Sequence, residues 1–199
     1  LDVSPSGLRA QVLAPEGRIL VNPVGNENQH ISFAQARRGG GNAVAPRCLV
    51  QNRDRNPLRG AAENRRGANA RISSGAQLRT YRLAVACTGE YAEFHGGTAI
   101  DAMTAINNTI NRVTGVYEQE VAIRFELVDD NDQLIFTDPA TDPFRNNNTN
   151  ALLNESQSEI DRIIGDNDYD IGHTFSTGAG GKAPGLVGVT GQQARGVTG

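Results

Sequence analysis

Tyr81-Arg-Leu-Ala-Val-Ala-Cys87 decides the fold, because its last five residues form a continuous apolar run. Such a run is typical of a strand that is covered on both faces by other elements. A tight connection that contains Gly89, Gly96 and Gly97 follows it, and a helical pattern begins directly afterwards. Strand, connection and helix together predict the opening of an α/β domain.

The helical pattern has recognisable ends. Thr98 is a suitable N-cap, and Asp101, three residues later, gives a pair similar to a capping box. Gly115 can supply the left-handed residue that ends a helix, so we predict a helix from Ala99 to Thr114. Its apolar residues recur at steps of three and four: Ile100, Met103, Ile106, Ile110 and Val113.

The rest of this region alternates strands and helices. The patterns predict strands at Val121–Val128, Tyr169–Phe175 and Leu186–Thr190, and a second helix at Asn150–Ile164. A polar loop, residues 129–150, precedes that helix, and a glycine-rich loop, Ser176–Gly185, follows the strand that ends at Phe175. This order predicts a twisted, mostly parallel sheet with two packed helices.

The sequence before Thr80 has two textures. Residues 1–36 predict a small β-rich unit, with short strands at Leu8–Leu13, Arg18–Val21 and His30–Phe33. Residues 37–79 are rich in Arg, Gly and Asn with little apolar periodicity, which predicts an extended linker. We therefore divide the chain into residues 1–36, 37–79 and 80–199. Arg65-Arg66 and Arg79 are plausible cleavage positions for a processing protease, although a solvated basic linker explains them equally well.

The formal charge of −3 hides an asymmetry between these parts. Residues 1–79 contain 12 arginines and 5 acidic residues, whereas residues 80–199 contain 7 basic and 17 acidic residues. A basic leader before an acidic domain can bind nucleic acid or its own acidic domain. A prosegment that lies on its own enzyme would have this pattern, and so would an unrelated linker.

The three histidines, His30, His95 and His173, do not have the spacing of a metal site. None belongs to an H-x-x-x-H or H-E-x-x-H pair, which would place two imidazoles on one helical face. We interpret His173 as a hydrogen-bonded structural residue in a strand and His95 as a turn residue. A zinc site made from this chain alone is not expected.

Two loops resemble ligand motifs without matching them. Asp129-Asp-Asn-Asp132 lacks the oxygen spacing of an EF-hand, so we interpret it as a solvated loop. In the loop Gly178–Ala183, Ala183 replaces the Ser or Thr of a P-loop, and no helical pattern follows it. We therefore exclude nucleotide binding at this loop.

Cysteines and the ends of the chain give weaker signals. Cys87, inside an apolar strand, is expected to be buried, and Cys48 is a minority candidate for an inhibitory zinc-binding thiolate. No apolar run approaches the roughly 18–20 residues of a membrane span, so no membrane partner is expected. Leu1 is not Met, which suggests a fragment or a processed piece.

Several segments together resemble a known family. Leu78-Arg-Thr-Tyr-Arg-Leu-Ala-Val-Ala-Cys-Thr-Gly-Glu-Tyr91, with Phe94-His-Gly-Gly-Thr98 after it, resembles the start of the catalytic domain in bacterial reprolysin-like metalloproteases of the M12B type, which are metzincins. Residues 1–23 resemble the end of their prosegment. Later segments resemble the family in the same order: Ile110-Asn-Arg-Val-Thr-Gly-Val-Tyr-Glu-Gln-Glu120, Asp168-Tyr-Asp-Ile-Gly-His173 and Ala194-Arg-Gly-Val-Thr-Gly199.

This resemblance implies a secreted zinc metalloendopeptidase whose partners are protein or peptide substrates and its own prosegment. The family's zinc helix carries H-E-x-x-H-x-x-G-x-x-H, with the Glu as general base on a zinc-bound water. The sequence ends before such a motif, so we expect the zinc ligands outside this chain, no catalytic residue within it and no activity of the chain alone.

The resemblance also implies one site within the chain. The family binds extended substrates along an upper edge strand by main-chain hydrogen bonds, and that strand corresponds to Ala183–Val189. Where the family often has a Cys, Thr190 removes one candidate disulfide partner for Cys87. The expected substrate-binding residues are Ala183, Gly185, Leu186, Val187, Gly188 and Val189.

Two other functions remain open at this point. One is a non-catalytic secreted binding or adhesion module on a metzincin-like scaffold, which the sequence downstream of Gly199 would distinguish from the enzyme. The other is nucleic-acid binding by the arginine-rich linker, which sparse aromatic residues and an acidic main domain disfavour. We therefore expect no nucleic-acid partner.

Overall fold

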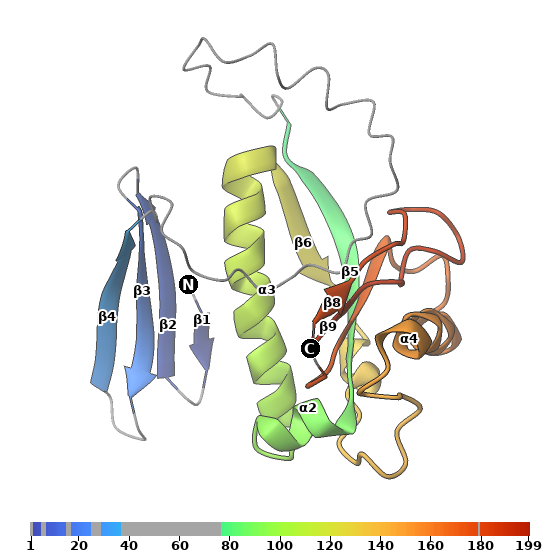
Figure 1. The fold of residues 1–199 in the computed structure, drawn as a ribbon. Helices are drawn as coiled ribbons and strands as arrows, with labels where there is room; N and C mark the ends of the chain where they lie inside the picture. Colours follow the sequence, from blue (N-terminus) through green and yellow to red (C-terminus); the bar gives the residue numbers. More distant parts are fainter. Residues whose placement is uncertain (1, 5–6, 15–16, 25–28, 37–76, 179) are drawn as a thin grey trace.

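The computed structural model describes residues 2–4, 7–14, 17–24, 29–36, 77–178 and 180–199 (Figure 1). They form two sheets, with a long helix, α3 (Ala99–Val121), between them. The first sheet contains β1 (Asp2–Ser4), β2 (Gly7–Ala14), β3 (Gly17–Val24) and β4 (Gln29–Ala36), in that order. The second contains β5 (Arg79–Cys87), β6 (Ile123–Leu127), β7 (Ile171–Phe175), β8 (Gly181–Lys182) and β9 (Val197–Thr198).

The second sheet has the strand order β6-β5-β7-β9-β8. The pairs β5–β6, β5–β7 and β7–β9 are parallel, and β8 pairs with β9 in the antiparallel direction. The prediction of an α/β fold with a mostly parallel sheet is confirmed. Both helices predicted to pack on this sheet, α3 and α4 (Thr149–Ile163), are present. The bounds of α4 lie within one residue of the predicted bounds.

The central strand β5 is covered on both faces, as its apolar run predicted. On one face, Leu83 and Val85 pack against α3, where Ala102 and Ile106 have no exposed surface. On the other face, Ala84 and Ala86 belong to the cluster that packs against α4. That cluster also contains these buried residues: Leu134, Phe144, Leu152, Leu153, Ile160, Tyr169, Ala194 and Val197.

Helix α3 extends beyond its predicted end at Thr114. It continues to Val121 and ends at Ala122, whose φ of 53° gives the left-handed C-cap that was assigned to Gly115. The apolar steps continue from Val113 to Tyr117, and the Tyr117 ring packs on Phe125 with ring centroids 5.0 Å apart. The strand predicted from Val121 therefore begins later, at Ile123.

A short helix, α2 (Gly89–Phe94), occupies the connection after β5 and was not predicted. Its N-cap is Thr88, whose hydroxyl accepts a hydrogen bond from the Tyr91 amide at 3.3 Å. His95 forms the C-cap, which confirms its interpretation as a turn residue. No helix in the described part of the chain is long and apolar enough to cross a membrane.

A buried asparagine completes the backbone bonding of β5. The 3-10 helix η2 (Asn131–Leu134) follows β6, and the Asn131 side chain lies beside Val85. Its Oδ1 accepts from the Val85 amide at 2.7 Å, and its Nδ2 donates to the Val85 carbonyl at 3.0 Å. The interpretation of residues 129–132 as solvated is wrong for Asn131, because this amide substitutes for a strand beyond the end of β6.

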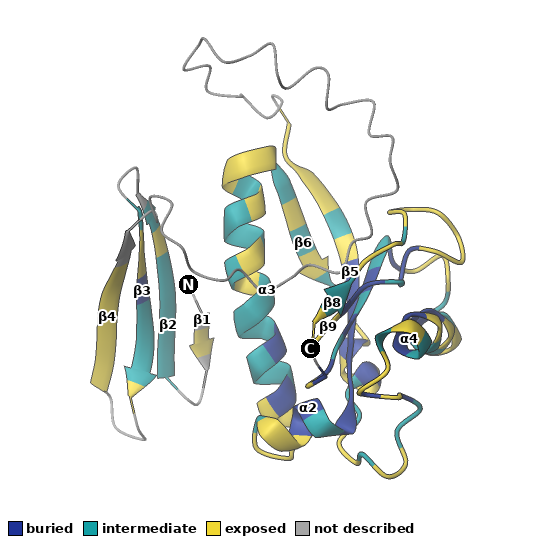
Figure 2. Cartoon of the chain, viewed as in Figure 1, coloured by how far each residue is buried: buried dark blue, intermediate teal, exposed yellow. Residues whose placement is uncertain are grey.

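The N-terminal sheet confirms the predicted β-rich unit, and all of its described pairs are antiparallel. It lies on the side of α3 away from β5 (Figure 1). Leu20, at 8% exposure, is the one buried hydrophobic residue described in it, whereas Val12, Ile31 and Phe33 are exposed (Figure 2). This sheet therefore has almost no core of its own.

Candidate functional site

The edge of the main sheet is formed by β8. Its residues Gly181 and Lys182 pair with Thr198 and Val197 of β9. The Lys182 ammonium group donates to Asn150 Oδ1 at 2.7 Å, which fixes β8 against the start of α4. Because β8 is the last strand of the sheet, its outer side has no strand partner among the described residues. An extended peptide can add to such an edge by main-chain hydrogen bonds.

The predicted strand Leu186–Thr190 is wrong. Residues 183–186 have no regular secondary structure, and turns occupy residues 187–188 and 190–194. The Val189 amide donates to the Leu186 carbonyl at 3.3 Å, and the Gln192 amide donates to the Val189 carbonyl at 2.9 Å. Gly188 and Gly191 have φ angles of 67° and 75°, which an extended strand does not contain.

The predicted substrate-binding residues thus follow the edge strand instead of forming it. The Gly188 amide donates to the Asp170 carbonyl at 3.2 Å, which holds the turn beside the start of β7. Leu186 and Val187 are 57% and 56% exposed, so this loop presents apolar side chains to solvent. Gly185 packs closely, since a Cβ there would collide with the Gln192 carbonyl oxygen.

An apolar groove of about 620 Å³ lies on the α3 face of the sheet, between that helix and the loop. Ala183 and Val187 line its loop side, and Val113 and Tyr117 line its helix side. Its floor comes from the strands: Tyr81, Leu83, Ile123, Phe125, Ile171, His173, Phe175 and Thr198. The groove therefore exposes a large apolar surface beside the sheet edge.

His173 is the histidine on the floor of this groove. Its Nε2 lies 2.9 Å from Thr198 Oγ1, and its ring packs edge-on against Phe175 at a centroid distance of 5.3 Å. Burial among apolar side chains lowers the pKa of His173 to about 4, so the imidazole is neutral at pH 7. The interpretation of His173 as a hydrogen-bonded structural histidine is confirmed.

The carboxyl ends of the parallel strands, where ligands often bind in α/β sheets, are closed by polar contacts. Asn146 Oδ1 accepts from the Thr88 hydroxyl at 3.0 Å and from the Thr177 amide at 2.9 Å. Asp142 accepts from the Gly89 amide at 2.6 Å. These bonds connect the ends of β5 and β7 to the loop before α4. The side chains of Asn146 and Asp142 therefore have structural roles.

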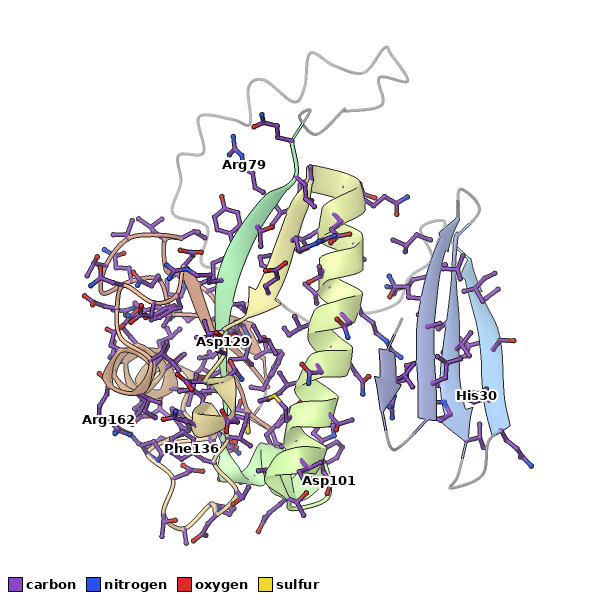
Figure 3. The ribbon with its side chains drawn as sticks, turned by 180° about the vertical axis from the view of Figure 1, so that it is seen from behind. His30, Arg79, Asp101, Asp129, Phe136 and Arg162 are labelled. Carbon is purple, nitrogen blue, oxygen red and sulfur yellow. The ribbon has the colours of Figure 1, made fainter. Side chains whose placement is uncertain are left out.

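The other candidate residues lie apart from each other. His30 belongs to the N-terminal sheet, on the opposite side of α3 from Asp129 (Figure 3), and its Nε2 accepts from the Leu8 amide at 3.1 Å. Cys87 is free and buried, and burial raises the pKa of its thiol to about 12, so it is a poor nucleophile or metal ligand. Cys48 lies outside the described residues.

Sequence reasoning found the loop side of the groove and missed its floor. The signal was present, because Ile171, His173 and Phe175 alternate along β7 and must share one face of the sheet. Asn131 and Asn146 gave no comparable signal, since each is an ordinary polar residue in a polar loop until its partner strand is known.

A comparison with protein families matches residues 77–198 to the model of metallopeptidase family M12B, reprolysin-like. A comparison with curated proteins finds no match. The matched residues include all of the main sheet, both helices that pack on it, and the edge with its loop. Because the match covers more than half of the chain, the protein belongs to the reprolysin-like metallopeptidases of family M12B.

Proposed function

We propose that this chain is part of a secreted, zinc-dependent metalloendopeptidase, in which residues 77–198 form the upper part of the catalytic domain. The observation that carries the proposal is that the family match begins just before β5 and ends at β9. Residues 1–36 would then be the end of the prosegment. The substrates would be proteins or peptides.

The described residues do not themselves fit a zinc ion. Among them, no group of three or more His, Cys, Asp or Glu side chains is arranged to hold a metal. His173 and His95 lie on different elements, and the pKa of each is lowered by burial. We therefore propose that the zinc ligands lie outside the described residues, and we assign no chemical step to the residues within them.

The proposed role of the described part is to bind and orient the substrate chain. The outer side of β8 would pair with an extended peptide, and the loop after it would contact the peptide's side chains. Support comes from the position of β8 at the sheet edge and from the exposed apolar side chains next to it. The proposed substrate-binding residues are Ala183, Gly185, Leu186, Val187, Gly188 and Val189.

The apolar groove supports the same proposal. An amphipathic helix that carries metal ligands on one face needs an apolar surface for its other face. The groove floor offers such a surface directly beside the edge and its loop. A helix packed there would place its polar face near a peptide bound to β8.

The test compares the full-length protein with the 199-residue chain. We expect the full-length protein to hydrolyse casein, to lose this activity with a zinc chelator and to regain it with added zinc. We expect the 199-residue chain to be inactive and to bind no stoichiometric zinc. If the purified 199-residue chain bound zinc and cleaved casein in a chelator-sensitive way, the assignment of the ligands would be wrong.

The substrate edge is tested in the full-length protein by Val187→Asp. Val187 is 56% exposed, so the change should leave folding intact while it adds a charge beside the bound peptide. We expect kcat/KM to fall at least tenfold for an apolar peptide substrate. Leu78→Asp, at a residue that is 48% exposed and precedes β5, is the matched control and should leave kcat/KM unchanged.

A non-catalytic binding module is the second candidate, because the open edge of β8 and the apolar groove beside it would serve peptide binding without any chemical step. It predicts that the full-length protein binds extended peptides without cleaving them, with or without zinc. Secretion is tested separately, by locating the full-length protein in fractions of its native cells and medium.

A further inference from the structure

A crevice of about 410 Å³ lies between β2 of the N-terminal sheet and α3. Its helix wall includes Thr104, Asn108 and Arg112, which are one turn apart and therefore share one face of α3. Arg9 of β2 belongs to the opposite wall. The crevice is thus a polar cavity with an arginine on each side, in contrast to the apolar groove beside the sheet edge.

The two arginines are neighbours in the fold. Arg112 donates to Asn22 Oδ1 of β3 at 2.5 Å. Ala10 and Val21 form the end pair of the β2–β3 ladder, so the next residue of each strand, Arg9 and Asn22, lie side by side. Both guanidinium groups therefore line the part of the crevice next to Asn22. Guanidinium groups that converge in this way bind phosphate and other oxyanions in many proteins.

This end of the crevice keeps a positive charge. None of the ion pairs found among the described residues includes Arg112, whose hydrogen bond goes to a neutral amide. Asp101 also lines the crevice, but it lies eleven residues before Arg112, roughly 16 Å along the helix axis. Its carboxylate accepts from the Thr98 hydroxyl at 2.6 Å. Burial lowers the pKa of His95, another lining residue, so this imidazole is neutral at pH 7.

Asn108 adds a hydrogen-bond donor beside Arg112. Its Oδ1 is buried and accepts no hydrogen bond from a described group. Because Asn108 lines the crevice while Oδ1 is buried, its Nδ2 amino group is the polar part of the side chain that faces the crevice. Asn108 lies four residues before Arg112, about 6 Å along the helix axis. Donors from both walls therefore surround the same part of the crevice.

The positions of these donors favour one class of anion. A tetrahedral dianion such as phosphate has oxygens that point in several directions, so it can accept hydrogen bonds from both walls at once. A carboxylate carries a single charge and two oxygens in one plane, so it can satisfy fewer of these donors. The crevice also leaves room for a further group attached to the anion.

We propose that the part of the crevice between Arg9 and Arg112 is a binding site for a small tetrahedral oxyanion, namely phosphate, either free or as a group of a larger molecule. The two guanidinium groups donate to the anion from opposite walls, and Asn108 donates from α3. The bound anion thereby links the N-terminal sheet to α3. This site is independent of zinc and of the proposed peptidase activity.

The experiment titrates the 199-residue chain, which contains both walls, by isothermal titration calorimetry at pH 7.5 and constant ionic strength. We expect inorganic phosphate to bind saturably, at one ion per chain, and acetate to bind at least tenfold more weakly. Methyl phosphate distinguishes the two sources of the ligand. An affinity similar to that of phosphate supports a phosphate group on a larger molecule, and weaker binding supports the free ion. If phosphate did not bind saturably, the site would be rejected.

Substitution of either arginine tests the two walls. Arg112→Gln and Arg9→Gln each remove one guanidinium group, so each should weaken phosphate binding by roughly tenfold. Arg124→Gln is the matched control, because Arg124 pairs with Glu118 and lies outside the crevice. It makes the same change in net charge and should alter the affinity by less than twofold. Equal losses in all three variants would mean that only net charge matters, and would overturn the site.

A pair of asparagines on α3 gives the sharpest comparison. Asn108→Asp replaces a donor in the crevice by a carboxylate that repels the anion, so phosphate binding should weaken at least tenfold. Asn111→Asp introduces the same charge at an exposed residue outside the crevice and should change the affinity by less than twofold. Equal affinities of the two variants would contradict the site. Circular dichroism checks that each variant is folded, and the titrations of the unsubstituted chain test the site without any variant.

Discussion

The two sheets on either side of α3 are stabilised in different ways. The main sheet is covered on both faces, and 17 of the 18 buried hydrophobic residues described belong to it or to the helices and loops around it. The N-terminal sheet contributes only Leu20 to that set. Regular backbone pairing is therefore present in both sheets, whereas a hydrophobic core, the main source of folding free energy, is present in one.

The same difference appears on the two sides of α3. Ala102 and Ile106 face the main sheet and are fully buried, whereas Arg112 donates to Asn22 of the N-terminal sheet and Asn108 lines the same crevice as Arg9 of that sheet. One helix thus joins a permanent apolar interface to a polar one. Substitutions on its two sides should have effects of different size, and this contrast can be measured.

The largest effect is expected for Ile106→Ala. Removing a fully buried side chain from the α3 cluster should lower the free energy of unfolding of the main sheet by about 2–5 kcal/mol. Leu20→Ala, in the N-terminal sheet, should leave the same transition almost unchanged. Urea unfolding followed by circular dichroism at 222 nm measures both. Equal losses would show that the two sheets unfold as one cooperative unit and that the contrast is wrong.

A slightly smaller loss is expected for Asn131→Leu. The change leaves the amide and the carbonyl of Val85 buried without their partner, and each unpaired group costs about 1–3 kcal/mol, so we expect a loss of about 2–4 kcal/mol. Gln133→Leu, at an exposed residue of the same 3-10 helix, is the control. A neutral result for Asn131→Leu would mean that water or another group replaces this amide.

Next in size is the effect of pH through His173. The pKa of His173 is about 4 in the folded state and about 6.5 in an unfolded chain, so the unfolded state binds a proton first as the pH falls. Stability should therefore decrease from pH 7.5 to pH 5 by up to about 2 kcal/mol. His173→Gln should remove most of this slope. The interval from pH 7.5 to pH 5 lies above the range in which Asp170 is protonated, because hydrogen bonds from Arg82 lower the pKa of Asp170.

His95→Gln tests whether the pH dependence of stability comes from His173 in the groove or equally from another histidine whose pKa is lowered by burial. Burial also lowers the pKa of His95, so it contributes to the slope in the same direction. It lies at the end of α2, away from the groove floor. If His95→Gln removed the slope and His173→Gln did not, the assignment of the titration to the groove would be wrong.

Elements with strong periodicity could be predicted from the sequence. The run ending at Cys87 predicted a strand covered on both faces, and the apolar steps of Leu153 and Ile160 predicted α4 almost to its ends. In both cases one local pattern determines both the element and the face that it buries. The parallel arrangement followed, because strands of one sheet that are joined through a helix run in the same direction.

Elements whose form depends on distant partners could not be predicted. Apolar residues around Val187 suggested a strand, but Gly188 and Gly191 adopt positive φ angles, and the main-chain bond to Asp170 holds a turn. The groove required knowledge of which strands lie side by side. Gly115 was interpreted by its most frequent role, a helix end, although the apolar steps continue beyond it.

Gly115 also provides the smallest predicted effect and the finest test of the contrast. Glycine in a helix interior costs about 0.5–1 kcal/mol relative to alanine. A Cβ on Gly115 would lie 3.9 Å from Gln11 Nε2, an ordinary contact distance, so the N-terminal sheet leaves room for it. Gly115→Ala should therefore raise the free energy of unfolding by about 0.5–1 kcal/mol, measured by urea unfolding at pH 7.5. A decrease would show that the sheet lies closer to α3 in solution, and that the polar side of the helix is packed as tightly as the apolar one.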